Sequence, residues 1–360
     1  MRLDIEITDE KCIWLESKDG IKKEFLMRPY RPGDEAGIRE IVTEEYGQSY
    51  FKKDFYDPEL IRRDAMSDNY RFFVAESDGI VVGLEIFHVF ANDEDYLEPA
   101  SQILRKAYRC FGLATAMVDY TFEIAKKMEP SALFVHAVTF HITTQLVCGE
   151  YGMVPTGFRL GSFMTEKMKN SYLLGKCDKY SEGIMIYPVA KKNAGILYIP
   201  KEVRDYADKI YKRLKVEYEI ADNPGSEDID LIRKSMPEKS ILDIRTDEEQ
   251  QIVKVTVIKE GSDIPDRMRK IINSFSDNPY WVIQISLCTS SEGIYGIYDD
   301  LKKIGFFCSG LKPLCGSCER LYMQWLGDMD LNMAEYVLTD EFKEIRQDIE
   351  SFMKQGERYE

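Results

Sequence analysis

Hydrophobic residues recur at two different spacings along the 360-residue chain. Apolar and polar residues alternate in several short stretches, which is typical of strands with one buried face. Elsewhere apolar residues recur every three or four positions, which is typical of amphipathic helices. The first element predicted is a hairpin at 3–23 with a turn at Lys18-Asp19-Gly20, and a strand that leads into a helix follows at 24–42, with Gly33 or Asp34 as the cap. A short helix is predicted from Asp57-Pro58. Two strands follow at 70–90 around the turn Ser77-Asp78-Gly79, and then an extended stretch at 96–105.

The clearest alternation of strand and helix patterns lies in residues 104–160. A helix is predicted at 113–127, where apolar side chains recur at three- and four-residue steps. The buried strand SALFVHAVT follows, then the helix HITTQLVCGEY, which Gly152 closes before the strand MVPTGFRLG. This order predicts an α/β domain with a mixed sheet at residues 24–165.

A similar order of elements returns in the second half of the chain. After a connecting strand and helix within 166–224, the composition of ADNPGSEDI predicts a linker at 221–229. The later elements are a hairpin at 241–258, a helix at 264–275, a strand at 281–287, a helix at 293–304 and a strand after Gly305. Because 281–311 repeats the order of 132–160, a second domain is expected at 225–360, with a C-terminal helix. Residues 1–23 are assigned to the N-terminal hairpin.

The charge and hydropathy of the chain exclude some classes of partner. The net charge is −15, which argues against nonspecific binding to nucleic acid or to an anionic membrane. The longest nearly apolar run, 79–91, contains Glu85 and His88 and is too short to span a membrane. The acidic, alternating N-terminus has no targeting signal, so a cytoplasmic protein is expected.

Eight cysteines are scattered along the chain and are expected to be reduced thiols. Cys315-Gly-Ser-Cys318, with Cys308 nearby, invites a zinc interpretation, but a structural zinc site needs four ligands and no histidine lies close in sequence. A turn between strands without a metal ion is therefore expected here.

Candidate chemistry concentrates in the loop before the helix at 113–127. Arg109-Cys110-Phe111-Gly112-Leu113-Ala114 fits the pattern R-x-x-G-x-A between a strand and a helix. Consecutive backbone N–H groups and the helix dipole suit such a turn to a pyrophosphate. The short pattern alone is equally compatible with an ordinary helix start that has a basic residue.

With its context, this segment resembles the GNAT superfamily of acyl-CoA-dependent N-acetyltransferases. LRKAYRCFGLA is similar to the family's V-x-P-x-Y-R-x-x-G-x-A, with Lys106 in place of the proline. Downstream, the family's N-x-x-A-x-x-L-Y-x-K-x-G-F is matched in spacing and in Gly152, but His141, Cys148 and Met153 replace its Asn, Tyr and Phe. The resemblance implies a splayed mixed sheet that holds acetyl-CoA as co-substrate, with no metal.

The resemblance also implies which residues meet the coenzyme. Backbone groups of Leu104, Arg105 and Lys106 would face the pantetheine arm, and His141 would lie at its end or act only at the helix start. The pyrophosphate would be held by a run of loop residues, namely Arg109, Cys110, Phe111, Gly112, Leu113 and Ala114, with the backbone more important than the Arg109 side chain.

Catalytic residues are expected in two places. Glu98, eleven residues before Arg109, is the first candidate for the base that accepts a proton from the amine, and Glu85 is the second; a water path is also open. Cys148 stands where the family often has a tyrosine acid, and is either a proton donor or an inert buried thiol.

The predicted function is acetyl transfer from acetyl-CoA to a primary amine of a small molecule or protein. The alternative is a non-catalytic acyl-CoA-binding or sensory protein. The aromatic residues Tyr46, Tyr50, Phe51 and Phe55 do not identify the acceptor, because they are equally compatible with a hydrophobic core. A homodimer is possible. The second domain is expected to be GNAT-like but degenerate, because Glu260-Gly-Ser-Asp263-Ile-Pro265-Asp266 replaces the loop and opposes an anion.

Overall fold

The computed structural model describes residues 1, 7–48, 50, 52–90, 95–167, 178–275, 277–316, 318–327, 329 and 331–356. The chain divides into two compact units. Unit 1 contains Met1–Val135 with Lys167–Ser171, and unit 2 contains His136–Glu166 with Tyr172–Glu360. The chain passes from one unit to the other within the strand β6 (Ala132–Val138).

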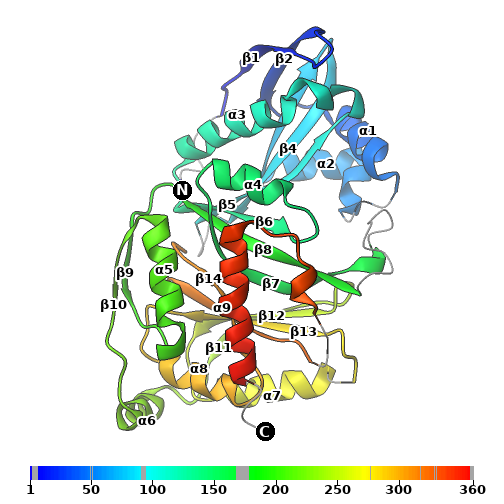
Figure 1. The fold of residues 1–360 in the computed structure, drawn as a ribbon. Coiled ribbons are helices and arrows are strands. Elements are labelled where there is room, and N and C mark those ends of the chain that lie inside the picture. The colour runs from blue at the N-terminus through cyan, green and yellow to red at the C-terminus, as the bar shows by residue number, and fades with distance from the viewer. Residues whose placement is uncertain are drawn as a thin grey trace. The chain divides into compact units, whose positions relative to one another are not determined.

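The strands of unit 1 pair in the order in which they occur along the chain (Figure 1). Those before β6 are β1 (Lys11–Glu16), β2 (Lys22–Pro29), β3 (Tyr70–Ser77), β4 (Ile80–Phe90) and β5 (Tyr96–Leu104). Neighbours are antiparallel, except that β5 pairs parallel with β6. The predicted turns at 18–20 and 77–79 are confirmed between β1 and β2 and between β3 and β4. Residues 2–6 of the predicted first hairpin lie outside the described residues.

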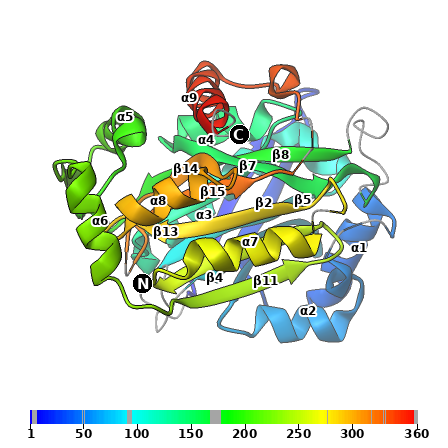
Figure 2. The ribbon, with the colours of Figure 1, turned by 90° about the horizontal axis from the view of Figure 1, so that it is seen from below.

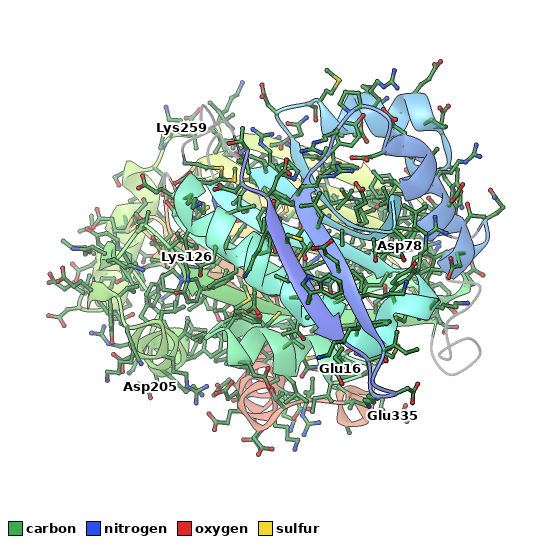
Figure 3. All side chains as sticks on the ribbon, turned by 90° about the horizontal axis from the view of Figure 1, so that it is seen from above. Glu16, Asp78, Lys126, Asp205, Lys259 and Glu335 are labelled. Atoms are coloured by element: carbon green, nitrogen blue, oxygen red, sulfur yellow. The ribbon has the colours of Figure 1, made fainter. Side chains whose placement is uncertain are left out.

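Helices cover both faces of the unit 1 strands (Figure 3). They are α1 (Glu35–Tyr46), η1 (Lys53–Tyr56), α2 (Pro58–Ala65), η2 (Lys106–Phe111) and α3 (Leu113–Met128). Leu84 and Ile86 of β4 share a core cluster with Ile38 and Ile41 of α1. Residues that alternate with them along the strand face the other way, so the carboxylate of Glu85 meets Thr121 of α3.

Unit 2 contains a mixed sheet and a separate strand pair. Its sheet strands follow the order β8-β7-β14-β15-β13-β12-β11. They are β7 (Val154–Met164), β8 (Lys179–Pro188), β11 (Ile241–Asp247), β12 (Ile252–Lys259), β13 (Val282–Cys288), β14 (Phe307–Lys312) and β15 (Arg320–Trp325). The short strands β9 (Asn193–Leu197) and β10 (Glu217–Ile220) pair parallel and were not predicted.

The helices of unit 2 include one where a linker is predicted. They are α4 (Thr143–Glu150), η4 (Lys201–Val203), α5 (Arg204–Leu214), α6 (Ser226–Ser235), α7 (Ile264–Phe275), α8 (Ile294–Lys302), η5 (Met333–Glu335) and α9 (Asp340–Gly356), and η3 (Thr165–Lys167) begins in this unit. Helix α7 packs against α8 (Figure 2). The predicted linker at 221–229 is wrong from Ser226 onward, where α6 begins. Within the described ranges, no helix is long and apolar enough to cross a membrane.

The predicted repeat of elements is present in the secondary structure. The order β6, α4, β7 and β8 matches the order β13, α8, β14 and β15, and in each set the last two strands pair antiparallel. Gly152 and Gly305 precede the third element of each set with φ values of 81° and 89°. Only glycine adopts this backbone conformation at little cost, which explains why both positions were readable from sequence. A second GNAT-like domain at 225–360 stays a prediction.

Two glycines bring β7 and β14 unusually close within unit 2. Gly157 is paired with Gly310. A Cβ built on Gly310 would lie 2.8 Å from the Cα of Gly157 and 3.0 Å from the carbonyl oxygen of Thr156. The side-chain amide of Gln324 completes the junction, because it donates to the Leu160 carbonyl and accepts from the Leu160 N–H, each at 3.0 Å.

Gly310→Ala is expected to lower the free energy of unfolding by about 1–3 kcal/mol, because the new methyl group forces the two backbones apart. Urea unfolding followed by circular dichroism measures the change. Gly149→Ala on α4 is the control, since a Cβ there meets nothing within 4 Å and replaces a helical glycine. A Gly310→Ala protein as stable as the Gly149→Ala protein would contradict the close approach.

Candidate active site

The R-x-x-G-x-A segment forms the junction between β5 and α3 in unit 1. After η2, Gly112 adopts a left-handed conformation with φ 74° and α3 begins at Leu113. No side chain caps α3 and its first turn has no acidic residue. A Cβ on Gly112 would find no atom within 4 Å, so the space beside this helix start is open. The N–H groups of a first helical turn have no partner within the helix, so this end of α3 is suited to an anion.

Aromatic packing fixes the position of this loop. Phe111 and Leu113 are buried, and the ring of Phe111 meets the ring of Phe25 edge-on at 5.5 Å. The Tyr108 ring contacts the same phenylalanine at 6.1 Å. Cys110 between them is exposed. The buried side chains therefore anchor the loop, while the backbone near Gly112 faces outward.

Carboxylates of α1 hold the basic side chains around the loop. Arg105 donates to Glu40 at 2.6 Å, and the Lys106 backbone N–H donates to Glu44 at 2.9 Å. Arg109 pairs with Glu45 and also donates to the carbonyl of Leu104 at 3.1 Å. The Arg109 side chain is thus engaged within the protein, which favours backbone amides as anion ligands. These glutamates were not foreseen, because nothing in sequence spacing connects α1 to a loop about 60 residues later.

Glu98 lies in a ladder of side chains across three strands of unit 1. Tyr70, His88 and Glu98 are directly opposite one another on β3, β4 and β5. The imidazole of His88 stacks on Tyr70 at 4.8 Å, and its Nδ1 lies 3.7 Å from Oε2 of Glu98. The Glu98 side chain is 17% exposed, so it can exchange protons with a bound amine or with water.

A cationic side chain borders this ladder. The ammonium of Lys52 lies 5.1 Å from the centre of the Tyr70 ring and 5.4 Å from that of Phe55. Burial lowers the pKa of Lys52, and the negative charges of Glu98 and Asp64 partly oppose this shift. The ladder therefore combines a carboxylate, an imidazole and a lysine on the α1–α2 face of the strands.

Glu85 lies on the opposite face and is fully buried. Its carboxylate accepts from Thr121 of α3 at 2.9 Å and from the side-chain amide of Gln102 at 3.1 Å. The same amide nitrogen donates to the carbonyl of Ala114 at 3.1 Å. Burial raises the pKa of Glu85 to about 7. Gln102, which sequence reasoning missed, thus joins the buried carboxylate to the first turn of α3.

An irregularity in β5 separates these residues from Glu98. The pairing of β4 and β5 shifts between Leu84 and Ile86, and Ser101 has a φ of 56°. The hydroxyl of Tyr50 donates to Ser101 at 2.8 Å or accepts from it. Tyr50 and Phe55 are core residues with Tyr46 packed against them, and Phe51 lies outside the described residues. The core interpretation of this aromatic region is therefore favoured.

Two predicted site residues lie in unit 2. His141 is exposed just before α4, and partial desolvation lowers the pKa of its imidazole. Cys148 is half-buried within α4. Glu98 and residues 104–114 belong to unit 1.

The segment at 260–266 supplies its own negative charges. Asp263, directly before α7, accepts from the Ser240 N–H at 2.7 Å. Glu260 accepts from the Ser291 hydroxyl at 2.6 Å, next to the start of α8. Its carboxylate is so close to Gly293 that a Cβ there would lie 2.1 Å from Oε2.

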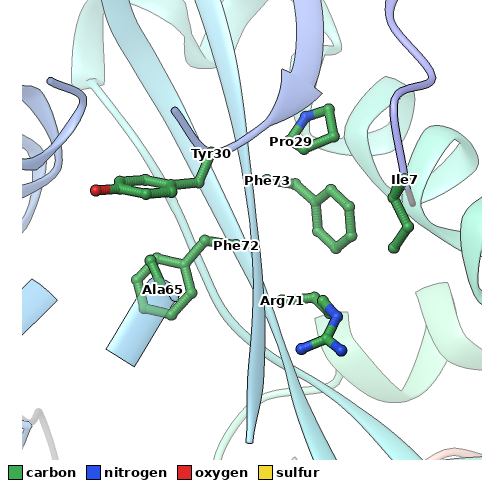
Figure 4. A pocket seen from close by; sticks show the side chains of 7 residues that line it. All are labelled: Ile7, Pro29, Tyr30, Ala65, Arg71, Phe72 and Phe73. Atoms are coloured by element: carbon green, nitrogen blue, oxygen red, sulfur yellow. The ribbon is translucent and has the colours of Figure 1, made fainter. Parts of the chain in front are cut away.

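A separate hollow of about 160 Å³ lies beside β2 and β3 in unit 1 (Figure 4). It is lined by Ile7, Pro29, Tyr30, Ala65, Arg71, Phe72 and Phe73. None of the residues predicted from sequence to bind coenzyme or to act in catalysis lines this hollow. Across the described part of the chain, no group of three or more His, Cys, Asp or Glu side chains is placed to hold a metal ion.

Comparisons with known proteins find one family model and a set of solved structures that are similar to part of the chain. Residues 36–141 match the model of the acetyltransferase (GNAT) family. No curated protein matches the chain. Among solved structures, the ribosomal-protein-S18-alanine N-acetyltransferase of Escherichia coli is similar at 13% identity and a TM-score of 0.37, covering 46% of this chain and 94% of that one. The spermidine/spermine N-acetyltransferase of Vibrio cholerae is similar at 16% identity and a TM-score of 0.37, with the same coverage of both chains.

The family match includes α1, the ladder that contains Glu98, the loop at 104–114 and all of α3. The chain has a mixed α/β fold, and residues 36–141 are an acetyltransferase domain of the GNAT family.

Proposed function

We propose that this protein is an N-acetyltransferase that transfers the acetyl group of acetyl-CoA to a primary amine of a small molecule or a protein. The family uses acetyl-CoA as its co-substrate. The observation that carries the proposal is the start of α3, where Gly112 leaves open space and no side chain caps the helix. An acyl-CoA would supply the activated acetyl group there.

The residues present fit such a co-substrate. Backbone N–H groups of Cys110 to Ala114 would bind the pyrophosphate, with the positive end of the α3 dipole behind them. The Arg105 N–H donates to the Val82 carbonyl, and the Lys106 N–H is held by Glu44. The pantetheine arm would therefore meet the end of β5 mainly through groups near Leu104 and the irregularity at Ser101.

Glu98 is the stronger candidate for the base. Its carboxylate is partly exposed beside His88, whereas Glu85 is sealed between β4, Gln102 and α3. A base must receive a proton from the amine directly or through one water, which requires access. Glu85 is better placed to support the first turn of α3. Cys148 is the candidate acid, or else an inert thiol.

The non-catalytic alternative is not favoured by the family match. It predicts coenzyme binding without turnover. Thiol release from acetyl-CoA, measured across a panel of primary amines, separates the two functions: binding of CoA with no release for any amine would favour the sensor.

Gly112→Asp is expected to weaken CoA binding at least tenfold, about 1.4 kcal/mol, because a carboxylate would face the pyrophosphate. Isothermal titration with CoA measures the change. Gly112→Asn is the matched variant, since asparagine tolerates the same backbone conformation without the charge. Gly79→Asp, at a turn glycine with similar φ and open space, should leave binding intact. Equal affinity of the Asp and Asn variants would remove this loop from the anion site.

Glu98→Gln is expected to lower turnover by roughly 10²–10⁴ at neutral pH while CoA affinity is kept, since only proton acceptance is lost. Steady-state thiol release with the best amine of the panel provides the measurement. Glu123→Gln, an exposed carboxylate of α3, is the control and should not slow the reaction. Cys148→Ala should also reduce turnover if the thiol is the acid. Full activity of Glu98→Gln would exclude Glu98 as the base.

Glu85 is expected to make stability fall as the pH rises from about 4.5 to 7. Over this range the folded protein keeps a proton that the unfolded chain has lost, because burial raises the pKa of Glu85 from 4.5 to about 7. Glu85 therefore contributes about 3 kcal/mol to the free energy of unfolding below pH 4.5, relative to its contribution at high pH. This contribution is lost as the pH rises above 7. Urea unfolding at several pH values, compared with Glu85→Gln, isolates this contribution. Parallel pH profiles for the two proteins would show that Glu85 does not titrate in this way.

A further inference from the structure

Two cysteines of unit 2 lie together where β13 meets β15. Cys288, the last residue of β13, is directly opposite Arg320, the first residue of β15. Cys318 is two residues before Arg320, in the turn that leads into β15, so its side chain lies on the same face of the sheet as that of Cys288. The Thr289 N–H donates to the Glu319 carbonyl at 2.8 Å, which holds the two segments beside each other. Both cysteines are half-buried, so a small reagent can reach them.

Arg320 is an unusual neighbour for these thiols. It is 5% exposed, and its Nη1 donates to the backbone carbonyl of Val257 at 3.2 Å. Its Nε is buried and has no hydrogen-bond partner among the described residues. Within the same part of the chain, Arg320 forms no ion pair with a carboxylate. A buried cation is costly without a negative partner, and Cys288 lies directly opposite this one across the β13–β15 pair.

We propose that Cys288 and Cys318 form a reversible dithiol–disulfide site, in which Cys288 is the reactive sulfur and Arg320 is the counter-ion of its thiolate. The site is independent of acetyl transfer. It takes low-molecular-weight disulfides as its oxidant and thiols as its reductant.

The reaction has two exchange steps. The Cys288 thiolate attacks one sulfur of the small disulfide, forming a mixed disulfide and releasing one thiol. Cys318 then loses its proton and attacks the Cys288 sulfur, which breaks the mixed disulfide and releases the second thiol. Two protein thiols are oxidised to one disulfide, the small disulfide is reduced to two thiols, and these carry the two protons.

Other cysteines provide a contrast within the same molecule. The neighbouring Cys318 thiol, the Ser290 backbone N–H and the charge of Arg320 lower the pKa of Cys288, although burial and Glu260 oppose the shift. Burial raises the pKa of Cys308 to about 12. Exposed Cys12 donates to Glu24 at 3.0 Å, which raises the pKa of its thiol. Thiolate character therefore favours Cys288 over a more exposed cysteine.

Oxidation also changes the surroundings of Arg320. The disulfide carries no charge, so its formation removes the anion that balances the buried guanidinium. The reduced form is stabilised by this ion pair, and the disulfide is expected to be easier to reduce than a purely structural one.

The test uses the full chain and oxidised glutathione, with peptide mass spectrometry to locate each bond. The wild-type protein should form a Cys288–Cys318 disulfide and lose two titratable thiols. Cys318→Ser should stop at a glutathione adduct on Cys288, and Cys288→Ser should form neither product. Cys12→Ser is the control and should form the same disulfide as wild type.

A second measurement compares rates of thiol alkylation. Iodoacetamide at pH 7 should alkylate Cys288 at least several times faster than Cys12, despite the greater exposure of Cys12. Arg320→Gln should shift the pH midpoint of Cys288 alkylation upward, which a merely structural arginine would not do. Faster alkylation of Cys12 than of Cys288, or glutathione adducts on exposed cysteines without a Cys288–Cys318 bond, would overturn the proposal.

Discussion

The contact between Gly157 and Gly310 is the constraint on which unit 2 depends. The two backbones are so close that neither position has room for a side chain, and Gln324 adds two hydrogen bonds across the same junction. Aromatic packing extends the effect, because a Cβ on Gly183 of β8 would lie 2.3 Å from the ring of Phe342 in α9. Helix α9 packs against both β7 and β14, so strands from the two sequence repeats pack against the same helix. In unit 2, β7 of the first repeat and β14 of the second repeat therefore lie side by side although they are far apart in the sequence.

A different principle shapes the acetyltransferase domain at 36–141. Carboxylates of α1 neutralise Arg105 and Arg109. The first turn of α3, by contrast, contains no acidic residue. The basic side chains are thereby fixed, while no side chain caps the start of α3. The side-chain amide of Gln102 donates both to Glu85 and to the Ala114 carbonyl, and so links the buried carboxylate to the first turn of α3. The domain thus pairs its basic side chains with acids of α1 and has no acidic residue in the first turn of α3.

Sequence reasoning succeeded where the structural requirement is local. Gly112, Gly152 and Gly305 were recognisable because a turn or helix end needs positive φ at that residue. The linker prediction failed because Ser226 and the acidic residues after it have loop-like composition, yet they also suit a helix start. Asp228 accepts from the Gly225 N–H at 3.2 Å and stabilises that start. The roles of Glu44 and Gln102 depend on contacts between distant segments, which spacing along one chain does not reveal.

The source of the balancing charge distinguishes the two repeats chemically. The first turn of α3 has no acidic residue. At the corresponding position of the second repeat, Asp263 precedes α7 and bonds to Ser240, while Glu260 lies over the start of α8. Helix starts that already have internal anions gain little from a phosphate, and a further negative charge would be repelled. Loss of coenzyme binding in the second repeat would therefore follow from charges that the chain itself supplies, with no change in the order of its strands and helices.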